Sequence, residues 1–582
     1  DKPTIIHQSS ATGMQVIPAT GVAQGLLHLE KYLPDKLVSG PREEKPVVIC
    51  SLGDASITEG EVSEALQFAA LKQLPVIYLV QDNKWGISVS SQESRSMDAY
   101  DYVEGFKGIK RSRVDGSDFE SSFACMKEVI QDVRQNRGPW LVQASVPLLG
   151  HHTSGVRKEF YRSSADLAMH AEKDPLLKLH ATLQTSLSAA DIADIENSCI
   201  SNVAKQFQQA VAAGEPDPAT VSEHVFVPTP VTREIGERKP VGAKPVMMVD
   251  AGLFAIREIM EQFEESIFFG QDVGRRLGGV FREAATLAEK FGDHRVFNTA
   301  IQEAYIVGST VGLSATGIKP IVEIQFADYI FPGINQLVTE ISKSCYLSYG
   351  KFPVQTLIRI PVGAYGGGGP YHSGCIETLL LSIKGIKIAY PSNSADMKGL
   401  MKSAFIDPNP VVMLEHKGLY WSKVPGTEDA RQPEPAQDYI LPLGKAAIVL
   451  EADPENDSAD PTCCIITYGM GVYWAISAAK HFPGQVDIID LRTLYPLDET
   501  MVFETVQKHG KCIVLTEEQA GNSFAQSLAG RISHQCFRYL DAPVEVIGAL
   551  DLPAVPMNTA LENAMLPNAS KVAERIRQLL NY

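Results

Sequence analysis

The sequence predicts an α/β protein whose strands form parallel sheets. Short continuous apolar runs, typical of strands buried on both faces, alternate with segments in which apolar residues follow helical spacing. Residues 47–80 contain a complete strand–helix–strand unit, which requires a parallel pair of strands. The same alternation restarts twice, each time after a stretch rich in Pro, Gly and charged residues. Three successive α/β blocks are therefore expected.

The first block is justified element by element. Residues 47–50 and 74–80 are apolar runs that predict strands, and the apolar residues between them, from Val62 to Ala70, follow helical spacing. A further strand is expected at 138–146. Ser188 is a plausible N-cap for a helix that continues to about Ala213.

The second and third blocks follow the same logic. We expect a helix at 301–316 and a strand at 320–326 in the second block. In the third block we expect strands at 446–450 and 463–467 and a C-terminal helix at 570–580. The Pro-rich stretches mark the boundaries, which we place as follows: a first domain at 1–220, a linker at 221–245, a second domain at 246–435 and a third domain at 436–582.

Composition excludes several classes of protein. Of the 582 residues, 45% are hydrophobic and 21% are charged, which is the mixture of a folded globular protein rather than of a disordered or fibrous chain. The net charge of −17 argues against a general binder of nucleic acid or anionic lipid. No apolar run is long enough to span a bilayer. The nine scattered cysteines contain no C-x-x-C pair, so we expect a reduced protein of the bacterial cytoplasm without disulfides.

Polar side chains follow the two neighbouring strands of the first block. Asp54 follows the first strand and Asn83 follows the second, so both are expected at the carboxyl edge of one sheet, where open α/β sheets bind ligands. Carboxylate and amide oxygens suit Mg²⁺ beside a phosphorylated group. The helix that begins near Glu59 directs its N-terminal N–H groups toward the same edge. Ordinary turn chemistry at strand ends is the alternative explanation.

The residues around Asp54 and Asn83 carry a resemblance. The segments G-D-A-S-I-T-E-G-E at 53–61 and D-N-K-W-G-I-S at 82–88 resemble the thiamine diphosphate fingerprint in the α subunit of the E1 component of 2-oxo acid dehydrogenases. By this resemblance, Asp54, Asn83 and the backbone carbonyl of Trp85 hold Mg²⁺. Gly53, Ala55 and Ser88 belong to the cofactor-binding set that it implies. Ala55 stands where the general motif usually has a second Gly.

Glu303 is the notable acid of the second block. It falls in the first turn of the helix expected at 301–316, where Thr299 and Gln302 fit a capping box and Gly317 fits the C-terminal cap. An acid in a first turn is commonly explained by the helix dipole alone. The surrounding segments, however, are similar to the β subunit of the same E1 family: G-Q-D-V-G at 270–274, G-G-V-F at 278–281, R-V-F-N-T at 295–299 and E-I-Q-F-A-D-Y at 323–329.

The resemblance covers nearly the whole chain in the order α, then β. It continues through D-L-R-T-L-Y-P-L-D at 490–498, which is similar to the C-terminal domain of the β subunit. The chain is therefore identified as a member of the E1 family with both subunits fused. The implied fold is two parallel-sheet domains that bind thiamine diphosphate, followed by a transketolase C-terminal-like α/β domain.

The resemblance also implies roles for single residues. Glu303 is implied as the acid that hydrogen-bonds N1′ of the aminopyrimidine and so promotes loss of the C2 proton. Gln325 and Tyr329 match positions that line the pyrimidine. His152 and His372 match the catalytic histidines: His152 for the substrate carboxylate and the dithiolane, His372 for proton transfer.

Two departures from the family pattern concern the first block. Residues 147–149 are Pro-Leu-Leu where the family often has Tyr-Arg upstream of Gly-His-His, and residues 153–157 differ from its usual Ser-Thr-Ser-Asp-Asp. The Tyr-Arg pair that grips the diphosphate in the family has no counterpart, so we expect a segment that precedes Asp1. The four glycines at 366–369 lack the spacing and the Lys of a P-loop.

A nicotinamide site is the competing interpretation for the third block. T-Y-G-M-G at 467–471 follows a strand and opens a helix, and Asp490 lies downstream, as in a dinucleotide fingerprint. The third glycine position is Trp474, whose bulk prevents the close helix–strand packing that the fingerprint needs. We therefore expect no dinucleotide there.

The expected function is that of an E1 enzyme acting as a homodimer. It decarboxylates a 2-oxo acid with thiamine diphosphate and Mg²⁺ and transfers the acyl group to a lipoyl group of an E2 partner. A branched-chain acid such as 3-methyl-2-oxobutanoate is favoured, with pyruvate as the alternative. A transketolase-like carboligase, which needs no lipoyl partner, is the other enzyme class, and a non-catalytic scaffold would have lost Asp54, Asn83 or Glu303.

Overall fold

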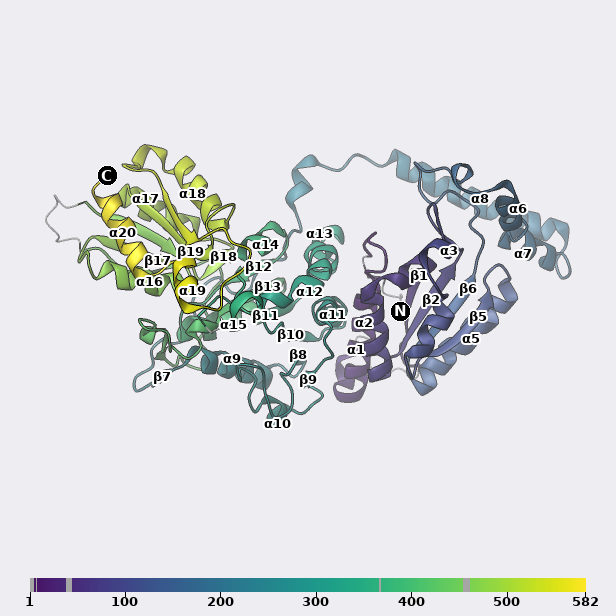
Figure 1. Ribbon diagram of the computed structural model, residues 1–582. Coiled ribbons are helices and arrows are strands. Elements are labelled where there is room, and N and C mark those ends of the chain that lie inside the picture. The colour runs from purple at the N-terminus through teal and green to yellow at the C-terminus, as the bar shows by residue number, and fades with distance from the viewer. Residues whose placement is uncertain (1–4, 7, 38–43, 366–367, 454–460) are drawn as a thin grey trace. The chain divides into compact units, whose positions relative to one another are not determined.

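The computed structural model describes residues 5–6, 8–37, 44–365, 368–453 and 461–582. The chain forms two compact units, Asp1–His224 and Val225–Tyr582, each of which is described by itself. Parallel sheets dominate both units, so the predicted α/β class is confirmed (Figure 1). Among the described residues, no helix combines the length and the apolar character that a membrane crossing needs.

Unit 1 is built on a four-stranded parallel sheet with the order β1-β2-β6-β5. Its main elements are α1 (Val16–Tyr32), β1 (Val48–Gly53), α2 (Gly60–Lys72), β2 (Val76–Asp82), β3 (Trp85–Gly86), β4 (Val89–Ser90), α3 (Ser91–Ser94), α4 (Ala99–Tyr102), β5 (Lys110–Asp115), α5 (Phe119–Asn136), β6 (Trp140–Ser145), α6 (Ser164–Ala171), α7 (Pro175–Leu183) and α8 (Ala189–Ala212). The βαβ unit predicted for residues 47–80 is β1-α2-β2.

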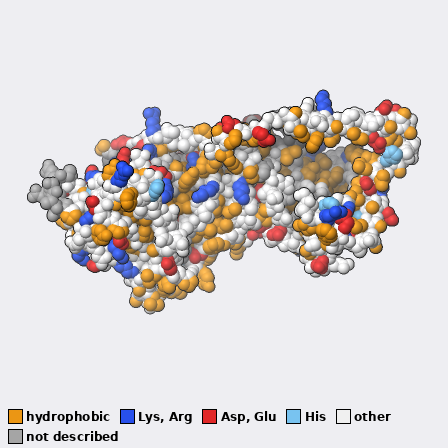
Figure 2. All heavy atoms as spheres, turned by 90° about the horizontal axis from the view of Figure 1, so that it is seen from above, with side chains coloured by type: hydrophobic (Ala, Val, Ile, Leu, Met, Phe, Trp, Pro, Cys, Tyr) orange, Lys and Arg blue, Asp and Glu red, His pale blue; other side chains and the backbone are white. Residues whose placement is uncertain are grey.

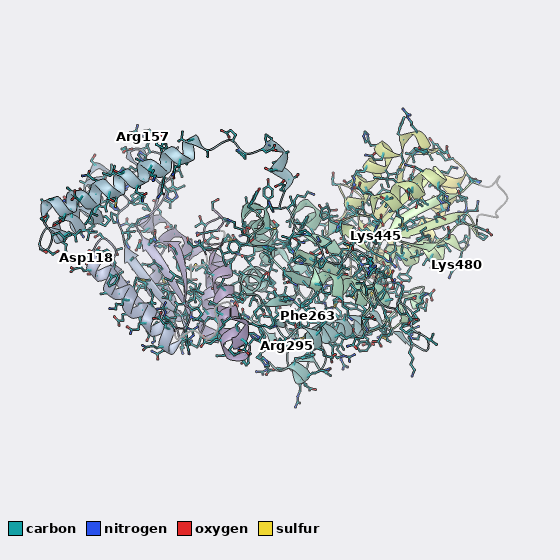
Figure 3. All side chains as sticks on the ribbon, turned by 180° about the vertical axis from the view of Figure 1, so that it is seen from behind. Asp118, Arg157, Phe263, Arg295, Lys445 and Lys480 are labelled. Carbon is teal, nitrogen blue, oxygen red and sulfur yellow. The ribbon has the colours of Figure 1, made fainter. Side chains whose placement is uncertain are left out.

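Helix caps explain where several helices of unit 1 begin. Ser188 caps α8 as predicted, and its reciprocal partner in the capping box is Asp191. Asp118, labelled in Figure 3, caps α5 by accepting a hydrogen bond of 2.8 Å from Ser121 N. Helix α1 was not predicted, because its apolar residues are spread around the helix: ten of its residues are buried.

Unit 2 contains a seven-stranded sheet with the order β18-β12-β13-β11-β10-β8-β9 and a five-stranded sheet with the order β15-β17-β16-β19-β20. The first sheet is formed by β8 (Ser266–Gly270), β9 (Val296–Asn298), β10 (Lys319–Glu323), β11 (Thr356–Val362), β12 (Lys387–Ala389), β13 (Pro410–His416) and β18 (Thr493–Tyr495). The second is formed by β15 (Ala447–Leu450), β16 (Cys463–Thr467), β17 (Val486–Asp490), β19 (Cys512–Gln519) and β20 (Glu545–Ala549). Only β18 and β15 run antiparallel to their neighbours in these two sheets.

Helices flank both sheets of unit 2. They are α9 (Met248–Gln262), α10 (Leu287–Phe291), α11 (Glu303–Ala315), α12 (Phe331–Gln336), α13 (Ser342–Leu347), α14 (Glu377–Ser382), α15 (Ser394–Ile406), α16 (Met470–Ala479), α17 (Glu499–His509), α18 (Phe524–Gln535), α19 (Thr559–Met565) and α20 (Ala569–Leu580). The short strands β7 (Pro245–Val246) and β14 (Gln432–Pro433) pair outside the large sheets.

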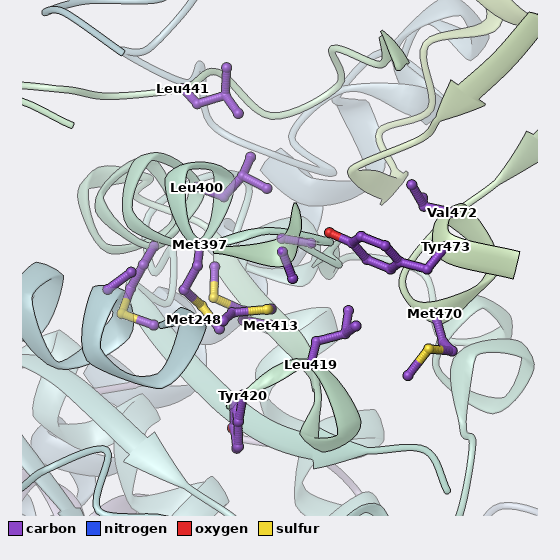
Figure 4. Close-up of a cluster of buried hydrophobic side chains, with 14 of the residues drawn as sticks. Met248, Met397, Leu400, Met413, Leu419, Tyr420, Leu441, Met470, Val472 and Tyr473 are labelled. Atoms are coloured by element: carbon purple, nitrogen blue, oxygen red, sulfur yellow. The ribbon is translucent and has the colours of Figure 1, made fainter. Parts of the chain in front are cut away.

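The two sheets of unit 2 share one hydrophobic core. Figure 4 shows Met397 and Leu400 of α15 in the same cluster as Met470 and Tyr473 of α16. In addition, β18, which belongs to the C-terminal part of the chain, is an edge strand of the first sheet. Burying these apolar faces against each other makes residues 225–582 one compact unit rather than two.

Arg295 connects three elements at one end of the first sheet in unit 2. Its guanidinium donates hydrogen bonds to the carbonyl oxygens of Met260, Phe263 and Ser266, at 2.9, 2.7 and 3.0 Å. Figure 3 shows Arg295 and Phe263 in this region. These bonds satisfy carbonyl groups at the end of α9 and the start of β8.

Asp490, at the end of β17, gives the first testable prediction. Burial raises the pKa of Asp490 to about 7, and the nearby charge of Asp396 adds to the shift. The folded state therefore favours the protonated form of Asp490. The contribution of this group to the free energy of unfolding is fully present below about pH 4 and is lost as the pH rises through about 7. We expect Asp490→Asn to reduce this loss by ~2–4 kcal/mol, measured as the free energy of unfolding from pH 4 to 8.

Asp487, on the same strand, is the matched control. Burial alone would raise its pKa, but hydrogen bonds from His509, Ala452 and Lys508 lower the pKa to about 2. Asp487→Asn is therefore expected to destabilise the protein at neutral pH and not to reproduce the effect of Asp490→Asn. Identical pH profiles for Asp490→Asn and the unmodified protein would contradict the assignment.

Candidate functional site

The carboxyl edge of the sheet in unit 1 brings Asp54 and Asn83 together. Gly53 lies opposite Gln81 in the pairing of β1 with β2, so the residues that follow each strand meet at one edge. The backbone N–H of Asn83 lies 3.5 Å from Oδ1 of Asp54, and Asp54 is only 3% exposed. The side-chain oxygen of Asn83 accepts a hydrogen bond of 2.9 Å from Trp85 N.

Ala55 fits the tight turn that follows β1. It lies in a 3₁₀ turn over Asp54–Thr58 and has a negative φ, so its methyl group causes no backbone strain. A Cβ atom at Gly86 would lie only 3.2 Å from the Cβ of Ala55. Gly86 therefore allows the hairpin formed by β3 and β4 to lie close to this turn. Ser88 is exposed between the two strands of that hairpin.

A second buried acid and an arginine complete this cluster. One terminal nitrogen of Arg95 lies 2.6 Å from Asp54 Oδ2 and 3.0 Å from Asp82 Oδ1. Burial raises the pKa of Asp54 above its ordinary value; the Arg95 charge opposes this shift and the Asp82 charge adds to it. Burial acts in the same direction on Asp82, but Lys84 and Arg95 outweigh it and lower the pKa of Asp82.

The donor set of this edge suits a hard divalent cation. Both oxygens of Asp82 already accept hydrogen bonds, from Lys84 N and Arg95 at one oxygen and from Lys84 Nζ and Gln143 at the other. Asp54 and Asn83 add carboxylate and amide oxygens at the same edge, which also accept hydrogen bonds, and this is the oxygen chemistry that Mg²⁺ prefers. The described residues contain no cluster of three or more His, Cys, Asp or Glu side chains that would hold a metal alone. A cation at this edge would need further ligands besides these side chains, such as backbone carbonyls.

The predicted histidine of unit 1 lies in a loop that follows β6. His152 and His151 are both exposed there. His151 Nδ1 accepts a hydrogen bond of 3.2 Å from Lys158 N.

In unit 2, Glu303 is the first residue of α11 and is half-buried. Its Oε1 atom accepts a hydrogen bond of 2.9 Å from the side chain of Gln271, which follows β8. The capping box predicted for Thr299 and Gln302 is wrong. The helix begins two residues later than predicted with Gln302 itself as the N-cap, and the Thr299 hydroxyl donates to the carbonyl of Ala300.

The C-terminal end of α11 agrees with the prediction. Gly317 follows the cap residue Thr316 and has a φ of +87°, the left-handed conformation that ends many helices.

A close approach of α12 holds Glu303 in place. A Cβ atom at Gly333 would lie 3.0 Å from the carbonyl oxygen of Glu303 and 2.9 Å from Val307 Cγ2. We expect Gly333→Ala to lower the free energy of unfolding by ~1–3 kcal/mol through overpacking, measured by denaturant unfolding. Gly60→Ala is the control, since a Cβ atom there meets nothing within 4 Å. Equal stability of the two variants would contradict the predicted close packing.

Gln325, Tyr329 and His372 lie near the carboxyl edge of the same sheet. The amide of Gln325 donates a hydrogen bond of 2.7 Å to Asp272 Oδ2. The hydroxyl of Tyr329 lies 2.8 Å from Nε2 of His372, and Nδ1 of His372 lies 3.2 Å from the carbonyl oxygen of Gly368. The ring of Phe326 meets the His372 ring edge-on, with 4.7 Å between the centroids. His372 is thus oriented from three sides.

His372 faces a cavity of about 470 Å³ within unit 2. The cavity has aromatic walls and two lysines in its lining, which consists of Phe281, Phe326, Tyr365, Gly368, His372, Lys417, Gly418, Trp421, Lys423 and Val424. Aromatic walls with a few polar groups are typical of sites that bind small organic molecules. Of the four glycines at 366–369, Gly366 and Gly367 lie outside the described residues.

Atoms of the protein itself occupy the space beside the two glycines of the turn at 467–471. A Cβ atom at Gly469 would lie 2.4 Å from the ring of Tyr390, and one at Gly471 would lie 2.1 Å from Thr467 Oγ1. These glycines permit packing between side chains and the backbone, and Trp474 is buried in the core.

Three residues at these edges were not predicted as site residues: Arg95, Gln271 and Asp272. Gln271 and Asp272 follow β8, a fully buried strand that was not among the predicted ones, and such a strand end is the signal that identified Asp54. Arg95 has no such signal, because only the folding of the loop after β2 brings it to Asp54.

Comparisons with known proteins assign all three parts of the chain. Residues 2–219 match the family described as dehydrogenase E1 component, residues 244–422 match the transketolase pyrimidine binding domain, and residues 454–572 match the transketolase C-terminal domain.

Curated relatives match the β-like part. The 2-oxoisovalerate dehydrogenase subunit beta of Bacillus subtilis is 36% identical over 337 residues, which are 57% of this chain and 98% of that protein. The pyruvate dehydrogenase E1 component subunit beta of Acholeplasma laidlawii is 38% identical over 338 residues, again 57% of this chain and 98% of that protein.

A solved transketolase mutant from Pichia stipitis shares the fold. The TM-score is 0.62 at 14% sequence identity, covering 98% of this chain and 81% of the transketolase.

The family matches and the curated relatives together show that the chain belongs to the thiamine diphosphate-dependent 2-oxo acid dehydrogenase E1 family, with α-like and β-like parts joined in one polypeptide.

Proposed function

We propose that the protein decarboxylates a 2-oxo acid and transfers the resulting acyl group to the lipoyl group of an E2 acyltransferase. The observation that carries this proposal is the pair of sheet edges, one with Asp54 and Asn83 and the other with Glu303 and His372, on the parts of the chain that match E1 and the pyrimidine binding domain. Thiamine diphosphate, when bound, supplies the carbon nucleophile and the electron sink that decarboxylation requires.

The residues of unit 1 bind the charged end of this cofactor. Asp54, Asn83 and the carbonyl of Trp85 hold Mg²⁺, and the loop residues Gly53, Ala55 and Ser88 border the diphosphate. The short 3₁₀ turn and α2 follow directly after β1, so backbone N–H groups at this edge also face an anion. The positive charge of the cation offsets the charge of the diphosphate.

The residues of unit 2 act on protons near the reacting end. Glu303 holds a proton at N1′ of the aminopyrimidine, and its hydrogen bond from Gln271 fixes the direction of its carboxylate. Gln325 and Tyr329 border the pyrimidine. His372, oriented by Tyr329 and Gly368, moves a proton during acyl transfer, and His152 binds the substrate carboxylate.

We infer that a branched-chain acid is the preferred substrate, with pyruvate as the alternative. Relatives named for 2-oxoisovalerate dehydrogenase include proteins of Bacillus subtilis, Pseudomonas aeruginosa and Arabidopsis thaliana, and relatives named for pyruvate dehydrogenase match at similar identity. In the proposed assembly, two copies form a homodimer in the bacterial cytoplasm. The domain boundaries predicted from the sequence are part of this proposal.

Turnover with a lipoylated E2 domain tests the proposal. Pyruvate or 3-methyl-2-oxobutanoate is supplied with and without Mg²⁺ and thiamine diphosphate, and CO₂ release and lipoyl acylation are followed. We expect both products only when both cofactors are present, with the higher kcat/KM for 3-methyl-2-oxobutanoate. If neither acid gives CO₂ release, the proposed reaction is wrong. If pyruvate has the higher kcat/KM, only the proposed substrate is wrong.

A further inference from the structure

A guanidinium lies between two buried carboxylates at the metal edge of unit 1. The side chain of Arg95 is 6% exposed, and those of Asp54 and Asp82 are 5% and 1% exposed. One nitrogen of Arg95 contacts both acids, at 2.6 and 3.0 Å. At such distances and in so little water, the arginine interacts strongly with both acids.

The loop after β2 delivers Arg95 to this position. The loop starts at Asn83, passes through the β3–β4 hairpin and forms the single turn of α3, which has a capping box between Ser90 and Glu93. Arg95 is the C-cap of α3, with an extended backbone that turns the chain back to the sheet edge. The segment that carries the proposed ligands Asn83 and Trp85 therefore ends in the residue that neutralises Asp54.

The two acids depend on Arg95 to different degrees. Asp82 also accepts hydrogen bonds from Lys84 Nζ at 2.7 Å and Gln143 at 2.9 Å, so it keeps a cationic partner without Arg95. Within the described part of the chain, Arg95 is the one cation that forms an ion pair with Asp54. A divalent cation that binds Asp54 thus meets a positive charge already in contact with its ligand.

We propose that Arg95 is the internal counter-ion of the metal site and competes with the divalent cation for Asp54. This inference rests on the proposed function, in which Asp54 and Asn83 are metal ligands. Arg95 stabilises the edge when no cation is bound, because otherwise two buried carboxylates would face each other. It also weakens the binding of a cation that arrives without the diphosphate, since no anion then offsets the guanidinium charge.

Titration with Mn²⁺ alone, followed by electron paramagnetic resonance of the free ion, tests the inference. We expect Arg95→Gln to bind Mn²⁺ roughly tenfold more tightly than the unmodified protein, because a charge-assisted contact no longer has to be broken. Arg134→Gln is the matched control: it removes the same charge from an exposed pair with Glu44 in the same unit and should leave the affinity unchanged.

A charge-neutral double variant guards against loss of folding. Arg95→Gln with Asp82→Asn removes one charge of each sign, so it leaves no extra buried carboxylate, and it should still bind Mn²⁺ more tightly than the unmodified protein. Thermal unfolding followed by circular dichroism verifies that each variant is folded. Equal or weaker Mn²⁺ affinity in folded Arg95→Gln and in the double variant would overturn the inference.

Asp54→Asn separates this inference from the proposed function. If Asp54→Asn weakens Mn²⁺ binding but Arg95→Gln leaves it unchanged, the metal site stands and the competition by Arg95 is wrong. If Asp54→Asn leaves Mn²⁺ binding unchanged, the proposed metal site is wrong and the competition is wrong with it.

Discussion

Replacing Glu303 with Gln is expected to lower kcat by about 10²–10⁴-fold, the range found when a positioned proton-transfer group is lost. Gln can still accept the hydrogen bond from Gln271 through its side-chain carbonyl, so the local geometry is kept. It cannot share a proton with N1′ as a carboxyl group does. Exchange of the C2 proton of bound thiamine diphosphate should therefore slow by a similar factor, while cofactor affinity changes little. Quenched-flow proton exchange followed by NMR measures this rate.

Glu289→Gln is the control for this prediction. Glu289 lies exposed on α10 in the same unit, so the same chemical change is made away from the site. Its exchange rate should equal that of the unmodified protein. Fast C2 exchange in Glu303→Gln would show that another group promotes loss of the proton.

Replacing Asp54 with Asn is expected to weaken Mg²⁺ affinity by at least ~10–100-fold. Mutating residues that only orient the ligands of a metal already costs that much affinity. Asn keeps the shape of Asp but offers a weaker ligand without charge. Thiamine diphosphate affinity should fall in parallel, because the cation carries the diphosphate. Isothermal titration with Mg²⁺ and thiamine diphosphate together measures both effects.

The matched control for Asp54→Asn is Asp35→Asn. Asp35 is an exposed acid of the same unit, in the 3₁₀ turn Pro34–Lys36, and its replacement should leave both affinities unchanged. Unchanged Mg²⁺ affinity in Asp54→Asn would place the cation on other residues.

The sheet edges could be predicted from the sequence because the signals are local. A strand that ends in Gly53-Asp54, and a second that ends in Asp82-Asn83, fix which side chains emerge at one edge of a parallel sheet. The expected burial of the first strand on both faces is wrong, because β1 is an edge strand in which Ile49 is 49% exposed. The Ser188 cap and the left-handed Gly317 were also predictable, since a cap depends on a few neighbouring residues.

Features that depend on long-range packing could not be predicted in this way. Thr299 and Gln302 have the spacing of a capping box, yet Glu303 begins the helix because β9 and the following turn are fixed by pairing with β8. Strand β18 belongs to the third block in sequence but joins the sheet of the second. Arg95 reaches Asp54 only after the intervening loop has folded. In each case tertiary contacts outweigh the local pattern.

The central claim is that a cation-anchored thiamine diphosphate is held by Asp54 and Asn83 at its charged end and by Glu303 at its pyrimidine. A crystal structure with Mn²⁺ and thiamine diphosphate, with the metal located by anomalous scattering, tests this claim most directly. We predict an Mn²⁺ peak bonded to the oxygens of Asp54 and Asn83, and N1′ within hydrogen-bond distance, about 2.6–3.2 Å, of a Glu303 carboxylate. A cofactor seated away from these side chains, or bound with no metal at Asp54, would contradict it.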